Sequence, residues 1–83
     1  MLSVKDNLIT IRGLIIPVDW DDGGKATAVA ASTFEEEEYL LDYSKKIDRL
    51  LSLIHKEVEV TGYVREKNGK KTMTVKEFHL KRT

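Results

Sequence analysis

The stretch EVEVTGYV, residues Glu57–Val64, alternates between apolar and polar side chains. Val58, Val60 and Val64 point to one side of an extended chain, which is the two-residue period of a half-buried strand. Gly62 occupies an inward position, where a glycine in a strand often marks a bend, a bulge or a close backbone approach. A helical pattern precedes this stretch and a hairpin signal follows it. We therefore expect it to form a central strand of a small barrel.

Two further strands are predicted earlier in the chain. Residues 8–18 are rich in β-branched side chains and predict a long first strand, with a bend at Gly13 that lets it serve both sides of a barrel. Pro17 lacks a backbone N–H, which places the end of this strand at an edge. A turn with two glycines follows at 19–24. The small side chains of residues 26–31 predict a second strand, with a face that is either crowded or left open for a ligand.

Residues 32–56 allow two interpretations. An apolar stripe at helical spacing and a capping box at Thr33–Glu36 fit one continuous helix. A second alternating pattern instead predicts a third strand at about 37–43 and a helix at about 45–55. We favour the strand followed by the helix, because the four strands that would otherwise remain are hard to close into a barrel.

The predicted helix has its own end signals. Ser44 or Asp42 would be its N-cap, since either side chain can accept a hydrogen bond from the first turn. Its apolar stripe would pack onto the open end of the barrel. His55 would end the helix, where a cation complements the negative end of the helix dipole.

The last strand is predicted from a hairpin. Asn68–Gly69 is the strongest short signal for a tight hairpin turn, and residues 72–80 form the returning strand. The apolar side chains in the first half of this strand are at odd positions and those in the second half at even positions, so a regular strand would point the two halves to opposite faces. One β-bulge near Lys76–Glu77 would turn four of them inward. These four are Met73, Val75, Phe78 and Leu80.

The expected order is three strands, one helix and two strands. This order makes residues 1–83 a single all-β domain, a five-stranded OB-fold-like barrel capped by a helix, with residues 1–6 as a loose N-terminal tail. Five motifs carry the pattern: EYLL at 38–41, LLSLI at 50–54, EVEVTGYV at 57–64, NG at 68–69 and TV at 74–75. In these motifs, over about residues 25–80, the chain resembles small stand-alone bacterial OB-fold proteins, which are largely uncharacterised. The resemblance implies the fold and no activity.

Composition limits the classes of protein further. The chain has 83 residues, enough for one domain, and no cysteine, which fits a reducing compartment. Its N-terminus does not resemble a signal peptide, and no apolar stretch is long enough to span a bilayer. We expect a cytoplasmic protein without a membrane contact.

The net charge is zero, but the charges are segregated. Residues 19–42 hold eight acids and one base, whereas residues 63–83 hold seven bases and two acids. Either the two regions attract each other as solvated surfaces, or one of them is an interaction surface. A neutral total argues against a dedicated nucleic-acid binder, because phosphate contacts dominate that affinity.

OB-folds commonly bind ligands on the face of strands two and three, between the loops that follow strands one and four. Here the first loop is acidic and the second is basic, so a site between them would be dipolar. The candidate ligand-binding residues are Trp20, Thr27, Tyr39, Tyr63, Arg65, Lys67, Lys70 and Lys71. Trp20 could instead anchor its loop on the barrel rim, and Tyr63 could cover a neighbouring strand.

A run of four acids, Glu35, Glu36, Glu37 and Glu38, is a candidate partner contact. Such a run is usually a solvated loop. It could also dock a basic partner, including the basic hairpin of a second copy, and that contact would weaken with salt.

The sequence offers no chemistry for catalysis. The aspartates from Asp19 onward fail the calcium-loop pattern, because Ala30 stands where the chelating glutamate is required. No histidine pair or cysteine has the spacing of a metal site, and no serine has a base at meaningful spacing. We expect no enzyme activity, metal or small-molecule cofactor.

The sequence therefore predicts a non-catalytic binding or adaptor module that makes a protein–protein contact or assembles with itself. The alternative is weak, sequence-tolerant binding of single-stranded nucleic acid through the barrel face and the basic hairpin at Lys67–Lys71.

Overall fold

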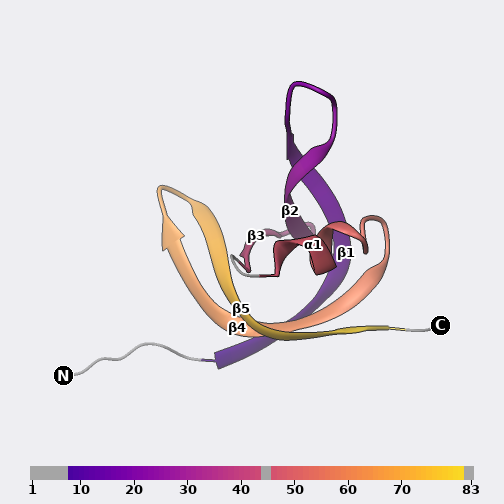
Figure 1. Ribbon diagram of the computed structural model, residues 1–83. Helices are drawn as coiled ribbons and strands as arrows, with labels where there is room; N and C mark the ends of the chain where they lie inside the picture. Colours follow the sequence, from indigo (N-terminus) through magenta and orange to yellow (C-terminus); the bar gives the residue numbers. More distant parts are fainter. Residues whose placement is uncertain (1–7, 44–45, 82–83) are drawn as a thin grey trace.

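The computed structural model describes residues 8–43 and 46–81, and the predicted tail at 1–6 lies outside them (Figure 1). Five strands and one short helix follow each other in the predicted order. They are β1 (Leu8–Trp20), β2 (Ala26–Thr33), β3 (Glu38–Asp42), α1 (Ile47–Leu51), β4 (Glu57–Lys67) and β5 (Lys70–Leu80). The strands close in the order β1-β2-β3-β5-β4. The five-stranded OB-fold-like barrel is confirmed, and the single long helix over residues 32–56 is excluded.

Strand β1 takes part in both halves of the barrel. It pairs with β4 through residues 8–14 and with β2 through residues 13–20. Gly13 lies where the two ladders meet, and a Cβ at this position would collide with the carbonyl of Ser32. The prediction that one strand serves both sides at Gly13 is confirmed.

The prediction that the end of the first strand lies at an edge, at Pro17, is confirmed. Strand β4 pairs only with residues 8–14 of β1, so at Pro17 the described residues give β1 one neighbouring strand, β2. Pro17 pairs with Val29 inside the ladder, and β1 continues to Trp20. The register shifts on both sides of Asp19. An edge strand tolerates a residue without a backbone N–H, because one side of it has no ladder to complete, so β1 continues two residues beyond the predicted end at residue 18.

The β4–β5 hairpin turns as predicted. Asn68 and Gly69 connect the strands with φ values of 55° and 80°. Positive φ at both central residues is the requirement of a type I′ turn, whose twist matches that of the flanking strands.

A bulge on β5 adjusts the side chains that face the core. Thr61 pairs with Glu77 and Gly62 with Val75, so Lys76 is the extra residue, as predicted. A Cβ on Gly62 would collide with the carbonyl of Thr74, which confirms the expected close approach. Met73 and Val75 are buried and Phe78 packs against the core, but Leu80 is 45% exposed. The prediction for Leu80 is wrong. Strand β3 pairs with β5 only through residues 71–74, so among the described residues β5 has only β4 beside it at Leu80, and the side chain stays open to solvent.

The helix is shorter than predicted. It spans only Ile47–Leu51, and its N-cap is Lys46, without a side-chain hydrogen bond. The predicted caps are therefore wrong, since Asp42 ends β3 and Ser44 lies outside the described residues. His55 does not end the helix either. It has a φ of 72°, and its N–H donates to the Ile15 carbonyl at 2.7 Å.

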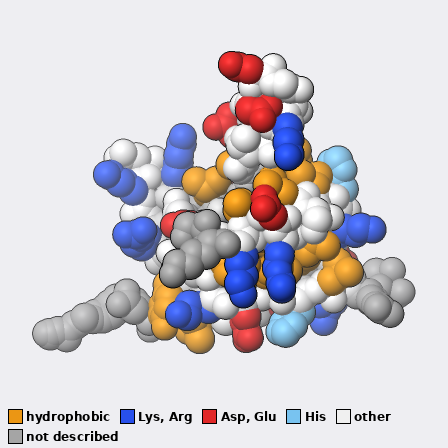
Figure 2. All heavy atoms as spheres, viewed as in Figure 1, with side chains coloured by type: hydrophobic (Ala, Val, Ile, Leu, Met, Phe, Trp, Pro, Cys, Tyr) orange, Lys and Arg blue, Asp and Glu red, His pale blue; other side chains and the backbone are white. Residues whose placement is uncertain are grey.

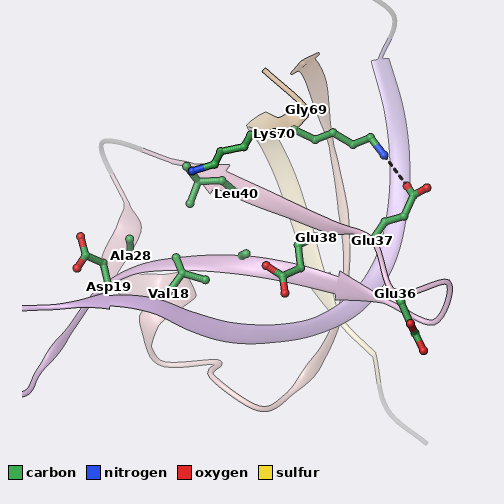
Figure 3. Close-up of a pocket in the computed structure, with 11 residues that line it drawn as sticks. Val18, Asp19, Ala28, Glu36, Glu37, Glu38, Leu40, Gly69 and Lys70 are labelled. Carbon is green, nitrogen blue, oxygen red and sulfur yellow. Dashed lines mark ion pairs between the residues drawn. The ribbon is translucent and has the colours of Figure 1, made fainter. Parts of the chain in front are cut away.

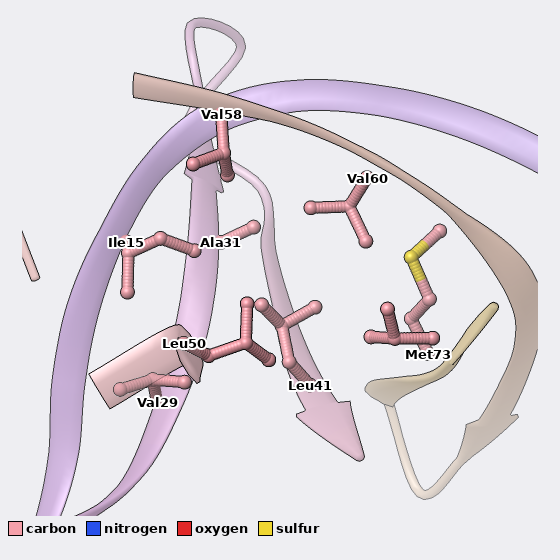
Figure 4. Close-up of a cluster of buried hydrophobic side chains, with 9 residues drawn as sticks. Ile15, Val29, Ala31, Leu41, Leu50, Val58, Val60 and Met73 are labelled. Atoms are coloured by element: carbon pink, nitrogen blue, oxygen red, sulfur yellow. The ribbon is translucent and has the colours of Figure 1, made fainter. Parts of the chain in front are cut away.

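The core is one cluster inside the barrel, to which the helix contributes Leu50 (Figure 4). Its members are Ile15, Val29, Ala31, Leu41, Leu50, Val58, Val60, Met73 and Val75. The partly buried residues Ile47, Leu51, Leu53 and Ile54 pack against the cluster, so the predicted stripe does face the barrel. Within residues 8–43 and 46–81, no helix has both the length and the apolar character needed to cross a membrane.

Candidate binding groove

A groove of about 750 Å³ lies on the outer face of β2 and β3, between the end of β1 and the β4–β5 hairpin (Figure 3). It combines small and apolar side chains with several charged ones. Its lining residues are Val18, Asp19, Ala28, Ala30, Glu36, Glu37, Glu38, Leu40, Gly69, Lys70 and Lys71.

The floor of the groove follows from strand alternation. Ala28 and Ala30 alternate along β2 with core residues, and Leu40 alternates in the same way on β3. Successive side chains of a strand point to opposite faces, so these residues lie outside the barrel. Two small methyl groups at this point leave the outer face hollow, while Val18 and Leu40 keep it apolar.

Charged side chains border this floor. Figure 3 shows Asp19 and Glu38 on either side of Val18 and Ala28, while Glu36 points away. Oδ1 of Asp19 accepts a hydrogen bond from the N–H of Trp20 at 2.9 Å. The remaining oxygen of this carboxylate stays available for a ligand, because a carboxylate offers two acceptor oxygens.

An ion pair joins the two sides of the groove. Nζ of Lys71 lies 3.0 Å from Oε1 of Glu37, and 5.5 Å from the ring centroid of Tyr39. The Tyr39 hydroxyl donates to the same Glu37 oxygen at 3.0 Å. The three side chains thus form a carboxylate–ammonium–aromatic cluster that links the β2–β3 turn to β5.

The pKa values of this cluster shift accordingly. Hydrogen bonds from Lys71 and then Tyr39 hold the pKa of Glu37 below its ordinary value. The hydrogen bond to Glu37 raises the pKa of Lys71. Burial, followed by the bond to Glu37, raises the pKa of Tyr39. All three shifts favour the protonation states that keep the cluster together near neutral pH.

A tight turn positions the acidic run. The Thr33 N–H donates to the Glu37 carbonyl at 2.9 Å, and the Glu36 N–H donates to the Thr33 carbonyl at 3.0 Å. The Glu37 N–H also donates to Oγ1 of Thr33 at 3.2 Å. These bonds fix the direction in which the chain leaves β2, and they place Glu37 opposite Lys71.

The groove is more acidic than the predicted dipolar site. It is lined by the acids Asp19, Glu36, Glu37 and Glu38 and by the bases Lys70 and Lys71. Without Glu36, which points away, three acids face two bases, so the groove carries one net negative charge. The difference arises because the acidic run, predicted as a separate partner contact, lines the same groove as the basic hairpin.

The structure brings together only some of the candidate residues. Lys70 and Lys71 line the groove, and Tyr39 adjoins it through Glu37. Five other candidates do not line it. Trp20 and Thr27 are exposed on β1 and β2, Arg65 and Lys67 are exposed on β4, and Tyr63 is half-buried on β4.

Two of the remaining candidates have other neighbours. Nζ of Lys76 lies 6.0 Å from the ring centroid of Tyr63. Glu35 lines a second, smaller pocket of about 310 Å³ together with Phe34 and Arg12. Phe34 is 76% exposed at the β2–β3 turn.

Sequence reasoning found the apolar floor only in part, since the small side chains of residues 26–31 indicated an open face but no residue of the floor was named. Val18, Ala28, Ala30 and Leu40 were not among the candidate residues. Strand alternation was a further signal for these residues, because on β2 and β3 each outward-facing residue of the floor lies next to a core residue of the same strand. Alternation shows only that a side chain points outward, so it does not distinguish the floor of a groove from any other outer surface.

The charge segregation seen in the sequence has a spatial counterpart (Figure 2). Acidic side chains gather at the tip of the β1–β2 hairpin, and basic side chains gather at the β4–β5 hairpin. The described residues contain no group of three or more side chains that could hold a metal ion.

No protein-family model and no curated protein matches this chain. The resemblance to small stand-alone OB-fold proteins of bacteria stays a prediction.

Proposed function

We propose that this chain is a non-catalytic binding module that contacts another protein through the groove on the outer face of β2 and β3. The observation that carries the proposal is the lining of the groove, an apolar floor with an excess of carboxylates around it. An apolar centre with a polar rim is the usual anatomy of a protein interface. The carboxylates oppose a phosphate backbone, because nucleic-acid affinity depends on neutralising phosphates with cations.

Contact with a different protein is favoured over self-assembly. The expected route to self-assembly was the docking of the acidic run onto the basic hairpin of a second copy. Within one chain, Glu37 already pairs with Lys71, so this attraction is partly satisfied without a second copy. The proposal keeps the cytoplasmic location expected from the cysteine-free composition.

Selection from a displayed library of random peptides tests the proposal. Ala28→Trp fills the groove, whereas Thr27→Trp adds the same side chain to a neighbouring exposed position outside it. We expect enriched peptides that bind the natural chain and the Thr27→Trp variant but lose at least about tenfold in affinity for Ala28→Trp, a loss of about 1.4 kcal/mol.

A selection without groove-dependent peptides contradicts the proposal. Analytical ultracentrifugation over a wide concentration range measures the mass of the natural chain and of Ala28→Trp alongside the selection. A mass that rises with concentration in the natural chain and stays constant in Ala28→Trp would identify a second copy as the occupant.

Weak binding of single-stranded nucleic acid is the second candidate. The observation that favours it is the exposure of Arg65, Lys67 and Lys70 on one hairpin. It predicts amide shifts confined to β2, β3 and this hairpin when a mixed-sequence oligonucleotide is added at low salt, with affinity that falls steeply as salt rises. An unchanged spectrum at millimolar oligonucleotide removes this candidate.

A further inference from the structure

We infer that the groove accepts a basic segment of a partner protein, with a lysine or arginine cation at Asp19 and Glu38 and its alkyl stem over Val18, Ala28 and Leu40. This inference names the chemistry of the partner and rests on the proposed function of the groove.

The first support is that, among the described residues, the unpaired carboxylates that face the groove outnumber its unpaired cation, Lys70. The described ion pairs are Arg12–Glu57 and Lys71–Glu37. Asp19 and Glu38 form no ion pair with a described residue, although both border the same apolar floor. A partner that brings cations to these carboxylates complements the groove, whereas an acidic partner adds repulsion, which costs several kcal/mol for closely placed like charges.

The second support is the arrangement of apolar and charged atoms. Val18 and Ala28 lie between the two carboxylates, and Leu40 lies across the groove (Figure 3). Lysine and arginine carry a long apolar stem with a charge at its end. They cover apolar surface with the stem while the charged head stays in a polar environment. A floor that ends in a carboxylate on each side matches this shape better than it matches a purely apolar side chain.

The third support comes from the chain's own lysine. Lys71 lines the same groove and places its ammonium on Glu37, with the ring of Tyr39 nearby. A cation beside an aromatic face and a carboxylate gains from both contacts. Glu37 and Lys71 line the groove, whereas Tyr39 lines the second pocket, so the contact shows one carboxylate of the groove holding a lysine. It leaves Asp19 and Glu38 for the cations of a partner.

Three labelled peptides of equal length provide the test, with alternating Lys and Ala, Gln and Ala, or Glu and Ala. Fluorescence anisotropy compares their affinities for the full chain at low and at physiological salt. We expect the Lys/Ala peptide to bind at least about tenfold more tightly than the Gln/Ala peptide at low salt, with a smaller difference at physiological salt, because exposed charges are screened. The Glu/Ala peptide should not bind.

Matched variants locate the contact. Asp19→Asn and Glu38→Gln should each weaken the Lys/Ala peptide about threefold, as expected for partly exposed ion pairs. Asp22→Asn and Glu77→Gln remove exposed carboxylates outside the groove and should leave the affinity unchanged. Ala28→Trp should abolish binding. Glu38→Lys provides a second disruptive variant in case the tryptophan impairs folding.

The outcomes separate this inference from the proposed function. Equal binding of the Lys/Ala and Gln/Ala peptides, lost in Ala28→Trp, would overturn the basic partner and leave the groove as the contact site. Neutral or acidic library peptides whose binding is lost in Ala28→Trp would likewise overturn the basic partner and leave the groove as the contact site. An affinity for the Lys/Ala peptide that is unchanged in Asp19→Asn, Glu38→Gln and Ala28→Trp would indicate nonspecific attraction. It would also overturn the inference. Loss of groove-dependent binding for every peptide would overturn the inference and the proposed function together.

Discussion

The two faces of the β2–β3 sheet carry similar residues but have different surroundings. Inside the barrel, Val29 and Ala31 have no exposed surface, and Leu41 is 4% exposed. Outside, Ala28 and Leu40 lie on the floor of an open groove, and Leu40 is 42% exposed. The inner face is filled by side chains from every other strand and from α1. The outer face is covered only in part, since Ala30 is buried there while Leu40 stays open.

The difference separates what specifies the fold from what is free to specify a partner. Inner side chains must fill a closed space at the density of a protein interior, so their size and shape are constrained. Outer side chains are constrained only by the sheet and by what binds to it. The small residues of the outer face therefore contribute little to the core, and in our proposal they shape the contact site.

The largest effect should come from two adjacent leucines of one strand. Leu41→Ala empties a buried site and should lower the free energy of unfolding by about 3 kcal/mol. Leu40→Ala removes a partly exposed side chain and should cost about 1 kcal/mol, while it weakens peptide binding to the groove. Urea unfolding followed by circular dichroism measures both. Equal losses would mean that the two faces do not differ as described.

A smaller loss is expected where the inner face meets a backbone. In Gly62→Ala the new methyl group would collide with the Thr74 carbonyl, so the bulge must shift at a cost of about 2 kcal/mol. Gly23→Ala is the matched control, because its nearest atom would be Oδ1 of Asp21 at 3.5 Å. That substitution should change stability by less than about 0.5 kcal/mol. Equal unfolding midpoints for the two variants would show that the strands separate easily at Gly62.

The inner face could be predicted from the sequence because it leaves a periodic signal. The alternation at Val58 and Val60, the glycine at 62 and the turn at Asn68–Gly69 each constrain a short segment. Together with a third strand at about 37–43 they predict the closed barrel that is observed. The bulge at Lys76 followed from the same requirement, since only a parity change turns both halves of β5 inward.

The extent of α1 could not be predicted in this way. An apolar stripe over 47–54 packs on the core whether it is all helix or a short helix followed by turns, so the pattern does not fix the end. The N–H of His55 donates to the carbonyl of Ile15 on β1 instead of to a carbonyl within a helix. This contact with a strand distant in sequence accompanies the end of α1 at Leu51, earlier than the local signals indicate.

The groove was harder to predict because it depends on contacts between segments far apart in the chain. Asp19, Glu38 and Lys70 come from three different regions, and only the closed barrel brings them to one side. The sequence indicated both charged regions but not that Glu37 and Lys71 would face each other. Such pairs carry no periodic signal.

The smallest expected effect concerns the ion pair between Glu37 and Lys71. Lys71 and Tyr39 lower the pKa of Glu37, so their stabilisation is present above the ordinary pKa of a glutamate and is lost as the pH falls through the lowered value. Lys71→Gln should raise the Glu37 titration midpoint, measured by NMR of its side-chain carboxyl carbon. Tyr39→Phe should raise it less, because the bond from Lys71 is the larger cause. Lys70→Gln removes a neighbouring lysine that does not pair with Glu37, and it should leave the midpoint almost unchanged. Equal midpoints in the natural chain and in Lys71→Gln would mean that the pair does not form in solution. Glu37 would then join Asp19 and Glu38 as a carboxylate that a basic partner can reach.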